Sequence, residues 1–211
     1  MSTKKGISYI TPLRLNNKFP FIIYTNPKKT RENIFIFNAK SIFEAYNLGI
    51  KESNFGVYCF LHDDTVILNK PEFEEKVYNI FSSDSTIGLI GVLGCKKLID
   101  GLYWGGQHVG IINNKHKIFG KKIEGLCEEV EGIDGLLMVT NLPILFDEIT
   151  YKGWDIYDLD MSRHMRSIKK KVVVGEFEIE HGIMGKNQEN KKRYEQAIEN
   201  RELYSKKWET K

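Results

Sequence analysis

Short apolar runs rich in β-branched residues alternate with helical patterns through the first half of the chain, and this alternation most constrains the fold. The strand candidates are residues 7–10, 21–24, 33–37, 57–61 and 87–92. Helices are expected at residues 41–51, where Ser41 and Glu44 fit a capping box, and from Asn69 onward. Strands that alternate with helices usually pair in parallel, so the pattern predicts an α/β fold with a mostly parallel, helix-flanked central sheet.

The second half of the chain has a less regular pattern. Residues 94–106 are rich in glycine and are expected to form a long irregular loop near whatever the sheet binds. Strand candidates at 108–113, 117–119 and 133–140 lie closer together, as in a small antiparallel extension, and a polar helical pattern runs from Asn187 onward. The 211 residues, of which 41% are hydrophobic, suffice for one core, so a single domain is expected.

Composition excludes few classes of function. The chain has 31 basic and 28 acidic residues, and the lysines of its tail alternate with glutamates as on a solvated helix, so nucleic acid is not expected as a partner. Its three cysteines are far apart and are interpreted as reduced thiols. No apolar stretch has the length of a signal peptide or a membrane span, and a cytoplasmic location is expected.

Three ionisable residues, His62, Asp63 and Asp64, directly follow the apolar strand at 57–61. In open α/β sheets, ligands bind at the carboxyl ends of the strands. Carboxylate and imidazole groups there suit a divalent cation that also holds a diphosphate. The alternative interpretation is that the two aspartates only cap a turn before Asn69.

Several stretches, taken in order, resemble the family-2-like glycosyltransferases of GT-A fold, and in particular their short glycosyltransferase-like branch. They are ISYITP at 7–12, NAKSIFEAYNLGI at 38–50, FLHDD at 60–64, IGLIGVLG at 87–94, EGIDGLLMVT at 131–140, FDE at 146–148, GWDIYDLDMSRHMR at 153–166 and EHG at 180–182. The resemblance implies a single Rossmann-like GT-A domain over residues 1–211. Residues 1–94 would bind the nucleotide sugar, residues 95–186 would form the acceptor and catalytic half with its antiparallel extension, and residues 187–211 the C-terminal helix.

The resemblance also implies a metal site. In that family, a D-x-D element after a central strand binds Mn²⁺ or Mg²⁺, which bridges the two phosphates of the donor. Here the first position is His62 and the last is Asp64, so Asp64 is the expected direct ligand, with His62 or Asp63 in support. The late His181 matches a histidine that coordinates the metal or touches the diphosphate. The alternative for His181 is a structural role.

The catalytic base is expected in the acidic stretch at 153–166, where Asp155, Asp158 and Asp160 are the candidates. Tyr157, Met161, Met165 and Ile168 are expected to form one apolar stripe of a helix there. Residues two apart on a helix point about 200° from each other, so only one of Asp158 and Asp160 can face a substrate. The resemblance implies that Asp158 is the base and that Asp160 supports it. Alternatively, the aspartates only favour the positive end of the helix dipole.

Four further residues are candidates, three from the family resemblance and Trp154 from the chemistry of its ring. Asp134 corresponds to a position near the acceptor and donor sugar, with a turn aspartate as the alternative. Asn47 would contact the donor or stabilise the metal loop, and Pro12 would begin the loop that cradles the nucleotide base, although both can be purely structural. Trp154 is a possible stacking surface for a sugar or base, or a lid on the core.

The expected function is that of a metal-dependent, hexosyltransferase-like enzyme that acts with inversion. Its donor would be a nucleoside diphosphate sugar, with UDP-sugars favoured, and its acceptor a glycan, a lipid-linked molecule or a protein. The alternative is a catalytically inactive protein of the same fold that binds sugar nucleotides or glycans.

Overall fold

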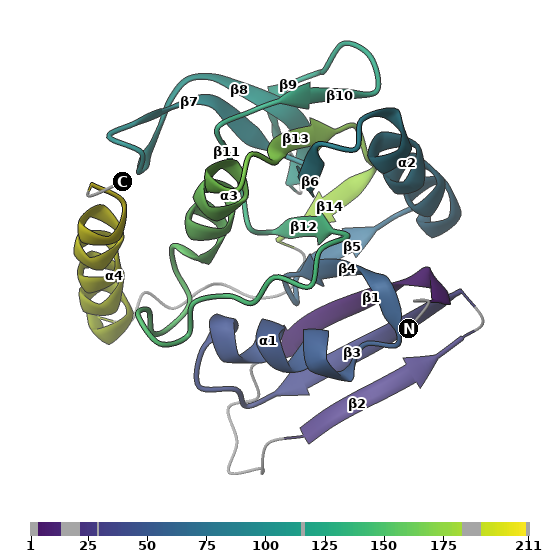
Figure 1. Cartoon of the computed structure of the whole chain (residues 1–211), viewed down its shortest axis with the longest axis horizontal. Helices are drawn as coiled ribbons and strands as arrows, with labels where there is room; N and C mark the ends of the chain where they lie inside the picture. The colour runs from purple at the N-terminus through teal and green to yellow at the C-terminus, as the bar shows by residue number, and fades with distance from the viewer. Residues whose placement is uncertain (1–3, 14–21, 29, 115–116, 183–190, 210–211) are drawn as a thin grey trace. The chain divides into compact units, whose positions relative to one another are not determined.

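The computed structural model of the chain describes residues 4–13, 22–28, 30–114, 117–182 and 191–209. The chain divides into two compact units whose segments alternate along the sequence. The first unit comprises residues 1–63, 142–157 and 186–211, and the second comprises residues 64–141 and 158–185. Strands and helices alternate through much of the chain, so the predicted α/β class is confirmed (Figure 1).

Four strands form the sheet of the first unit, in the order β4-β1-β3-β2. They are β1 (Lys4–Leu13), β2 (Ile22–Pro27), β3 (Arg31–Phe37) and β4 (Phe55–Leu61). Strand β1 pairs in parallel with both β3 and β4, and β2 pairs antiparallel with β3. The strands predicted here are confirmed, although Phe21 lies outside the described residues. Because β1, β3 and β4 are parallel, their carboxyl ends lie at one edge of the sheet.

Helix α1 (Ile42–Glu52) connects β3 to β4 and packs on β1 and β3 (Figure 1). It begins where predicted, because the Ser41 hydroxyl accepts a hydrogen bond of 3.1 Å from the N–H of Glu44. The Glu44 carboxylate accepts from the N–H of Lys40, one residue before the N–H used in a capping box. Gly49 lets the helix approach β1 closely, since a Cβ there would lie 2.2 Å from Cγ2 of Ile10.

The second unit contains four strands in the order β10-β13-β6-β12. They are β6 (Ile87–Gly91), β10 (Cys127–Glu129), β12 (Leu137–Thr140) and β13 (Lys171–Gly175). Strands β6 and β13 are parallel, whereas β12 pairs antiparallel with β6 and β10 with β13. Helix α2 (Lys70–Ser83) packs on β6 and β13. It begins at the predicted cap, because the Asn69 side chain accepts a hydrogen bond from the N–H of Glu72.

A further sheet of the second unit has the order β11-β7-β8-β14-β5, with β9 also paired to β8. Its strands are β5 (Thr65–Ile67), β7 (Gly94–Ile99), β8 (Tyr103–Asn114), β9 (Lys117–Lys121), β11 (Gly132–Ile133) and β14 (Ile179–His181). All these pairs are antiparallel except β14 with β8. An antiparallel extension in the second half of the chain is therefore present.

The prediction of an irregular loop at 94–106 is wrong, because β7 and β8 form a hairpin there. Asp100 and Gly101 both have positive φ, and the N–H of Leu102 donates to the carbonyl of Ile99 at 3.0 Å. Positive φ at both positions is typical of the Asp-Gly turns found in hairpins, and Leu102 completes a three-residue connection between the paired Ile99 and Tyr103. Gly105 belongs to strand β8, where a Cβ would lie 2.4 Å from Cγ1 of Ile99.

The single strand predicted at 133–140 is two strands that pair with different partners. Strand β11 pairs with β7, and β12 pairs with β6. The Asp134 carboxylate turns the chain between them, because it accepts a hydrogen bond of 2.9 Å from the N–H of Leu136.

Two more helices complete the described chain, α3 (Tyr157–Ser167) and α4 (Lys191–Glu209). The predicted tail helix is confirmed as α4, although residues 187–190 lie outside the described residues. Helix α4 packs along the segment before α3 within the first unit. The amide of its buried Asn200 donates to the carbonyl of Lys152 at 2.5 Å and accepts from the N–H of Lys152 at 3.3 Å. Lys207 also pairs with Asp147 at 2.8 Å.

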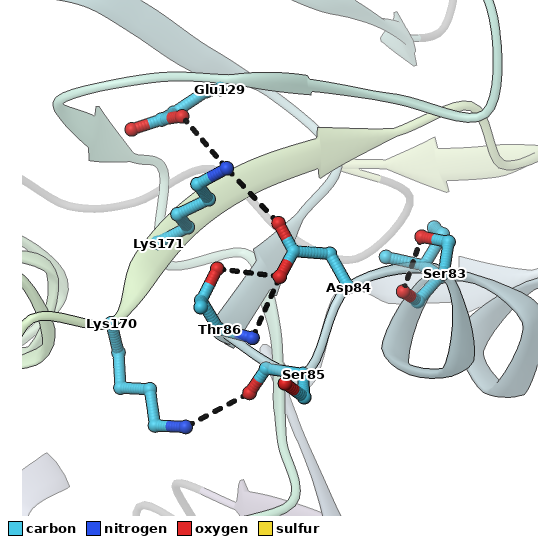
Figure 2. Close-up of polar contacts among 8 residues, drawn as sticks. Ser83, Asp84, Ser85, Thr86, Glu129, Lys170 and Lys171 are labelled. Atoms are coloured by element: carbon cyan, nitrogen blue, oxygen red, sulfur yellow. Dashed lines mark hydrogen bonds and ion pairs between the residues drawn. The ribbon is translucent and has the colours of Figure 1, made fainter.

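A polar network joins the end of α2 to β13 and β10 (Figure 2). The Lys171 ammonium lies 3.0 Å from a carboxylate oxygen of Asp84 and 3.8 Å from one of Glu129. The other Asp84 oxygen accepts from the N–H and the hydroxyl of Thr86, at 2.8 and 2.6 Å. Hydrogen bonds from Thr86, followed by the one from Lys171, lower the pKa of Asp84 to about 2. The carboxylate therefore stays charged and ties the turn before β6 to the start of β13.

The carboxylate of Glu32 is fully buried in the first unit. It accepts hydrogen bonds from the Ser8 hydroxyl at 2.5 Å, and from the N–H and the side-chain amide of Asn54 at 2.7 Å each. Glu32 therefore links β1 and β3 to the turn that leads into β4.

Glu32→Ala is expected to lower the free energy of unfolding by about 2 kcal/mol, because the buried Ser8 hydroxyl and two donors of Asn54 lose their acceptor. Urea denaturation of the purified variant measures this loss. Glu52→Ala, which removes an exposed glutamate, serves as the control and should change stability by less than about 0.5 kcal/mol. Equal losses in the two variants would contradict the structural role of Glu32.

Candidate functional site

Two candidate residues, Pro12 and His62, lie at the edge of the sheet where the parallel strands β1, β3 and β4 end. Ile10 of β1 pairs with Phe60 of β4, and β4 ends at Leu61, directly before His62. Pro12, expected to begin a loop, is instead a buried residue of β1 that pairs with Ile36. Proline is tolerated there because the register of β1 with β4 ends at Ile10, so Pro12 lies beyond that ladder.

Asp64 and His181 are brought together by the pairing of β5 with β14. The antiparallel register places His181 opposite Thr65, and the N–H of Gly182 donates to the carbonyl of Asp64 at 3.0 Å. An Asp64 carboxylate oxygen then lies 3.3 Å from Nε2 of His181. Both side chains are about a quarter exposed or less, at 20% and 26%.

His62 lies in the same cluster, because it precedes Asp64 by only two residues of continuous chain. One ligand atom from each of His62, Asp64 and His181 lies within 4.8 Å of those of the other two. Asp63, between His62 and Asp64, is exposed and is not part of this group. The three predicted metal residues are therefore close enough to share one ion.

The chemistry of this cluster fits a divalent cation. Imidazole nitrogens and a carboxylate oxygen are common ligands of such ions, and three protein ligands leave positions open for other oxygens. The hydroxyl of Thr65, next to Asp64 in the chain, is buried, and within the part of the chain that the structure describes it has no hydrogen-bond partner. A polar ligand nearby would satisfy this hydroxyl, since buried polar groups are rarely left without one.

Tyr157 orients His62 and was not identified from the sequence as a site residue. Its hydroxyl makes a short hydrogen bond with Nε2 of His62. The tyrosine ring is buried and packs edge-on against the rings of Phe43 and Tyr46 of α1, at centroid distances of 6.3 and 5.8 Å. The sequence predicts Tyr157 on the apolar stripe of a helix, and its burial confirms this. The spacing of residues does not reveal its contact with His62.

Asp158 lies in the first turn of α3, and backbone N–H groups hold both of its carboxylate oxygens. One oxygen accepts from Gly135 at 3.0 Å, and the other accepts from Leu159 at 2.8 Å. The hydroxyl of Ser162 donates to the Asp158 carbonyl at 2.7 Å and accepts from the N–H of Ile133 at 3.3 Å. The start of α3 is thus tied to the turn that contains Asp134.

Burial, followed by the nearby negative charge of Asp134, raises the pKa of Asp158 to about 7, although the residue keeps some exposed surface. Hydrogen bonds from the N–H groups of Leu159 and Gly135 act in the opposite direction. Asp158 therefore exchanges its proton near neutral pH, as a general acid or base requires.

The other two acidic candidates lie in different surroundings. Asp160 is buried, with 6% of its surface exposed, and Asp155 is partly buried and precedes α3. The predicted apolar stripe is confirmed for Tyr157, Met161 and Met165, which are all buried. It is wrong for Ile168, which follows the end of α3 and is 44% exposed.

Asn47 lies beside the segment that leads into α3, and Trp154 belongs to that segment. The side-chain amide of Asn47 donates to the carbonyl of Phe146 at 2.9 Å and accepts from its N–H at 2.7 Å, so it holds the backbone of that segment. Trp154 is partly exposed and follows Gly153, whose carbonyl accepts from the N–H of Ile42 at 3.0 Å. Both residues therefore lie in the first unit.

Comparison with known proteins identifies one matching family. A family model described as "Glycosyltransferase like family" matches residues 23–208. No curated protein matches the sequence. Within the described ranges, no helix is both long and apolar enough to cross a membrane.

Asp158→Asn is expected to gain stability relative to the wild type as pH rises from about 4 to about 7. A raised pKa means that the protonated carboxyl favours the folded state, and this contribution is lost as the pH passes from 3.8 to about 7. The amide carries no charge, so the relative gain reaches at most about 4 kcal/mol, at about 1.4 kcal/mol per pKa unit. Urea denaturation of both proteins at pH 5 and pH 8 measures it. A difference that does not change with pH would contradict the raised pKa.

Proposed function

The chain belongs to the glycosyltransferase-like family, and from this premise we propose that it transfers a hexosyl group from a nucleoside diphosphate sugar to an acceptor hydroxyl. UDP-sugars are the favoured donors, and the acceptor hydroxyl belongs to a glycan, a lipid-linked molecule or a protein. The observation that carries this proposal is the Asp158 carboxylate, which backbone N–H groups hold in place and whose pKa is about 7.

In the proposed reaction, Asp158 is the general base. The bond between the sugar carbon and the diphosphate oxygen breaks, a new bond forms from that carbon to the acceptor oxygen, and Asp158 takes the acceptor proton. A single displacement of this kind inverts the sugar carbon. The N–H groups of Gly135 and Leu159 fix the direction of the Asp158 carboxylate. The negative charge of Asp134 helps to keep the pKa of Asp158 high enough for Asp158 to hold the acceptor proton.

His62, Asp64 and His181 are proposed to hold a divalent metal ion, with Asp64 as the direct carboxylate ligand. When bound, such an ion neutralises charge on the diphosphate leaving group. The residues themselves supply the position: the β5–β14 register fixes Asp64 beside His181, and Tyr157 fixes the ring of His62. The family match and this cluster support a divalent ion, and we propose Mn²⁺ or Mg²⁺.

The remaining candidates receive supporting roles in this proposal, within a single GT-A domain over the whole chain. Pro12, at the carboxyl end of β1, lies on the edge proposed to receive the nucleotide. Asn47 maintains the backbone at Phe146, and Trp154 offers a partly exposed ring for stacking against a sugar. Asp134 and Asp160 act on the acceptor side, Asp134 through its charge on Asp158.

Asp158→Asn should lower the rate of donor turnover by about 10²- to 10⁴-fold while donor binding is kept, because the amide cannot accept the proton. Release of nucleotide from UDP-, GDP-, dTDP- and CMP-sugars, with water or added sugars as acceptor, measures turnover. Asp100→Asn, which changes an exposed aspartate of the β7–β8 turn, is the matched control and should keep the wild-type rate. Full activity of Asp158→Asn would exclude Asp158 as the base. Binding of a donor without turnover by the wild type would favour an inactive binding protein.

The dependence of turnover on pH provides a second test. Wild-type activity should fall as the pH drops below about 7, because Asp158 becomes protonated. Asp134→Asn removes the neighbouring charge that raises this pKa, so the midpoint of the fall should move to lower pH. An unchanged midpoint would mean that Asp134 does not act on the titrating group.

Asp64→Ala should abolish the stabilisation that a donor and a metal ion give together. A ligand at about 100 times its dissociation constant adds about 2.7 kcal/mol to the stability of a protein that binds it only when folded. Melting curves with donor, with metal and with both measure this effect in the wild type and the variant. Equal stabilisation of the two proteins would remove Asp64 from the binding site.

A further inference from the structure

The β7–β8 hairpin of the second unit (Figure 1) carries an aromatic pair that the proposed reaction does not use. The ring of Trp104 packs edge-on against the imidazole of His108, with the ring centroids 5.1 Å apart and the ring planes at 80°. His108 is exposed and Trp104 is partly exposed. By contrast, Trp208 is buried, with 4% of its surface exposed. Trp104 is therefore not a core residue, and part of its surface is accessible to a ligand.

An irregularity in the register of β8 accompanies this contact. Cys95 pairs with His108 and Lys97 pairs with Gly105, so β8 uses three residues where β7 uses two. Four residues of a regular strand span about 13 Å, which holds the side chains at its two ends apart. A bulge bends and twists one strand, and bulges often redirect a side chain beside a functional site. The backbone of the hairpin thus helps to bring the rings of Trp104 and His108 together.

The same segment offers hydrogen-bonding groups beside the aromatic surface. Trp104 has an indole N–H, His108 has an imidazole, and the exposed Gln107 has a side-chain amide. Among the residues that the structure describes, none of these three groups has a hydrogen-bond partner. A sugar ring matches this combination, because its C–H groups pack on the negatively polarised face of an indole and its hydroxyls pair with amide and imidazole groups.

The register of the sheet also places this segment near the turn that contains Asp134. Cys95 of β7 pairs with His108 of β8 and with Gly132 of β11, so β7 lies between the other two strands. Neighbouring strands lie about 4.8 Å apart, which puts about 10 Å between the backbones of His108 and Gly132. Gly132 precedes Asp134 by two residues, and Asp134 lies close enough to Asp158 to affect its charge. The spacing is comparable with the length of a disaccharide, and all these residues belong to the second unit.

We propose that Trp104, Gln107 and His108 form a glycan platform that binds a sugar ring of the acceptor, and that the acceptor is a glycan of at least two sugar residues. The terminal sugar presents its hydroxyl to Asp158, and a sugar further along the glycan stacks on Trp104. A lipid chain would offer no partner to the amide and imidazole groups. The proposal rests on the function proposed above and selects one of its classes of acceptor.

The test measures glycan binding by the full chain without donor or metal. The probes are an array of immobilised glycans and the free disaccharides maltose, lactose, cellobiose and chitobiose, whose dissociation constants are measured by saturation-transfer NMR. Trp104→Ala removes the ring, and Trp104→Phe keeps a smaller aromatic surface. Ile99→Ala is the matched control, because Ile99 is an exposed apolar residue of the same hairpin. Ile99 follows Leu98, the partner of Trp104, and successive residues of a strand point to opposite faces.

The wild type and Ile99→Ala should bind the same probe with equal affinity. Trp104→Ala should weaken this binding by about tenfold or more, and Trp104→Phe should weaken it less. Full binding by Trp104→Ala, together with a loss in Trp154→Ala, would place the sugar elsewhere and overturn the proposal. Failure of the wild type to bind any probe would also overturn it, even where a variant does not fold.

These outcomes separate the glycan platform from the proposed function. With a donor present and the bound glycan as acceptor, Trp104→Ala should raise the acceptor KM by about tenfold, whereas Ile99→Ala should leave it unchanged. Glycan binding that depends on Trp104, in a protein that turns over no donor, would keep the platform and remove the transferase. Donor turnover by a wild type that binds no glycan probe would keep the transferase and overturn the platform.

Discussion

The antiparallel pairing of β5 with β14 is the constraint on which the metal cluster depends. These two short strands join segments that are far apart in the sequence, and their register places His181 opposite Thr65. A shift of one residue would turn every side chain of β14 to the other face of the sheet. The hydrogen bond from Gly182 to the carbonyl of Asp64 continues the pairing one residue further and fixes the carboxylate beside the imidazole.

The charge of Asp158 is set by a balance of opposing contacts. Burial and the charge of Asp134 favour the protonated form, whereas the N–H groups of Gly135 and Leu159 favour the carboxylate. The same turn supplies Asp134 and the N–H of Gly135, so one local structure both raises the pKa and orients the group. A helix dipole acting alone on an exposed aspartate would have lowered the pKa instead.

Local signals in the sequence predicted the parts of the fold that local contacts determine. Helices α1 and α2 begin at Ser41 and Asn69 because those side chains cap them, and β4 ends where its apolar run ends. The β7–β8 hairpin was missed because its glycines suggested a loop, although the Asp100-Gly101 pair is a hairpin signal. The contact of Tyr157 with His62 and the charge of Asp134 near Asp158 follow from tertiary packing, which residue spacing alone does not reveal.

Two asparagines, Asn47 and Asn200, hold the segment that leads into α3 by pairing with the N–H and carbonyl of a single residue each. Their amides act as substitute peptide groups, so this segment obtains strand-like hydrogen bonding without a neighbouring strand. An amide has no proton to gain or lose near neutral pH. The hydrogen bonds of these two amides therefore keep the same strength when Asp158 gains or loses its proton. The backbone of the segment is held in a way that does not depend on pH near neutrality.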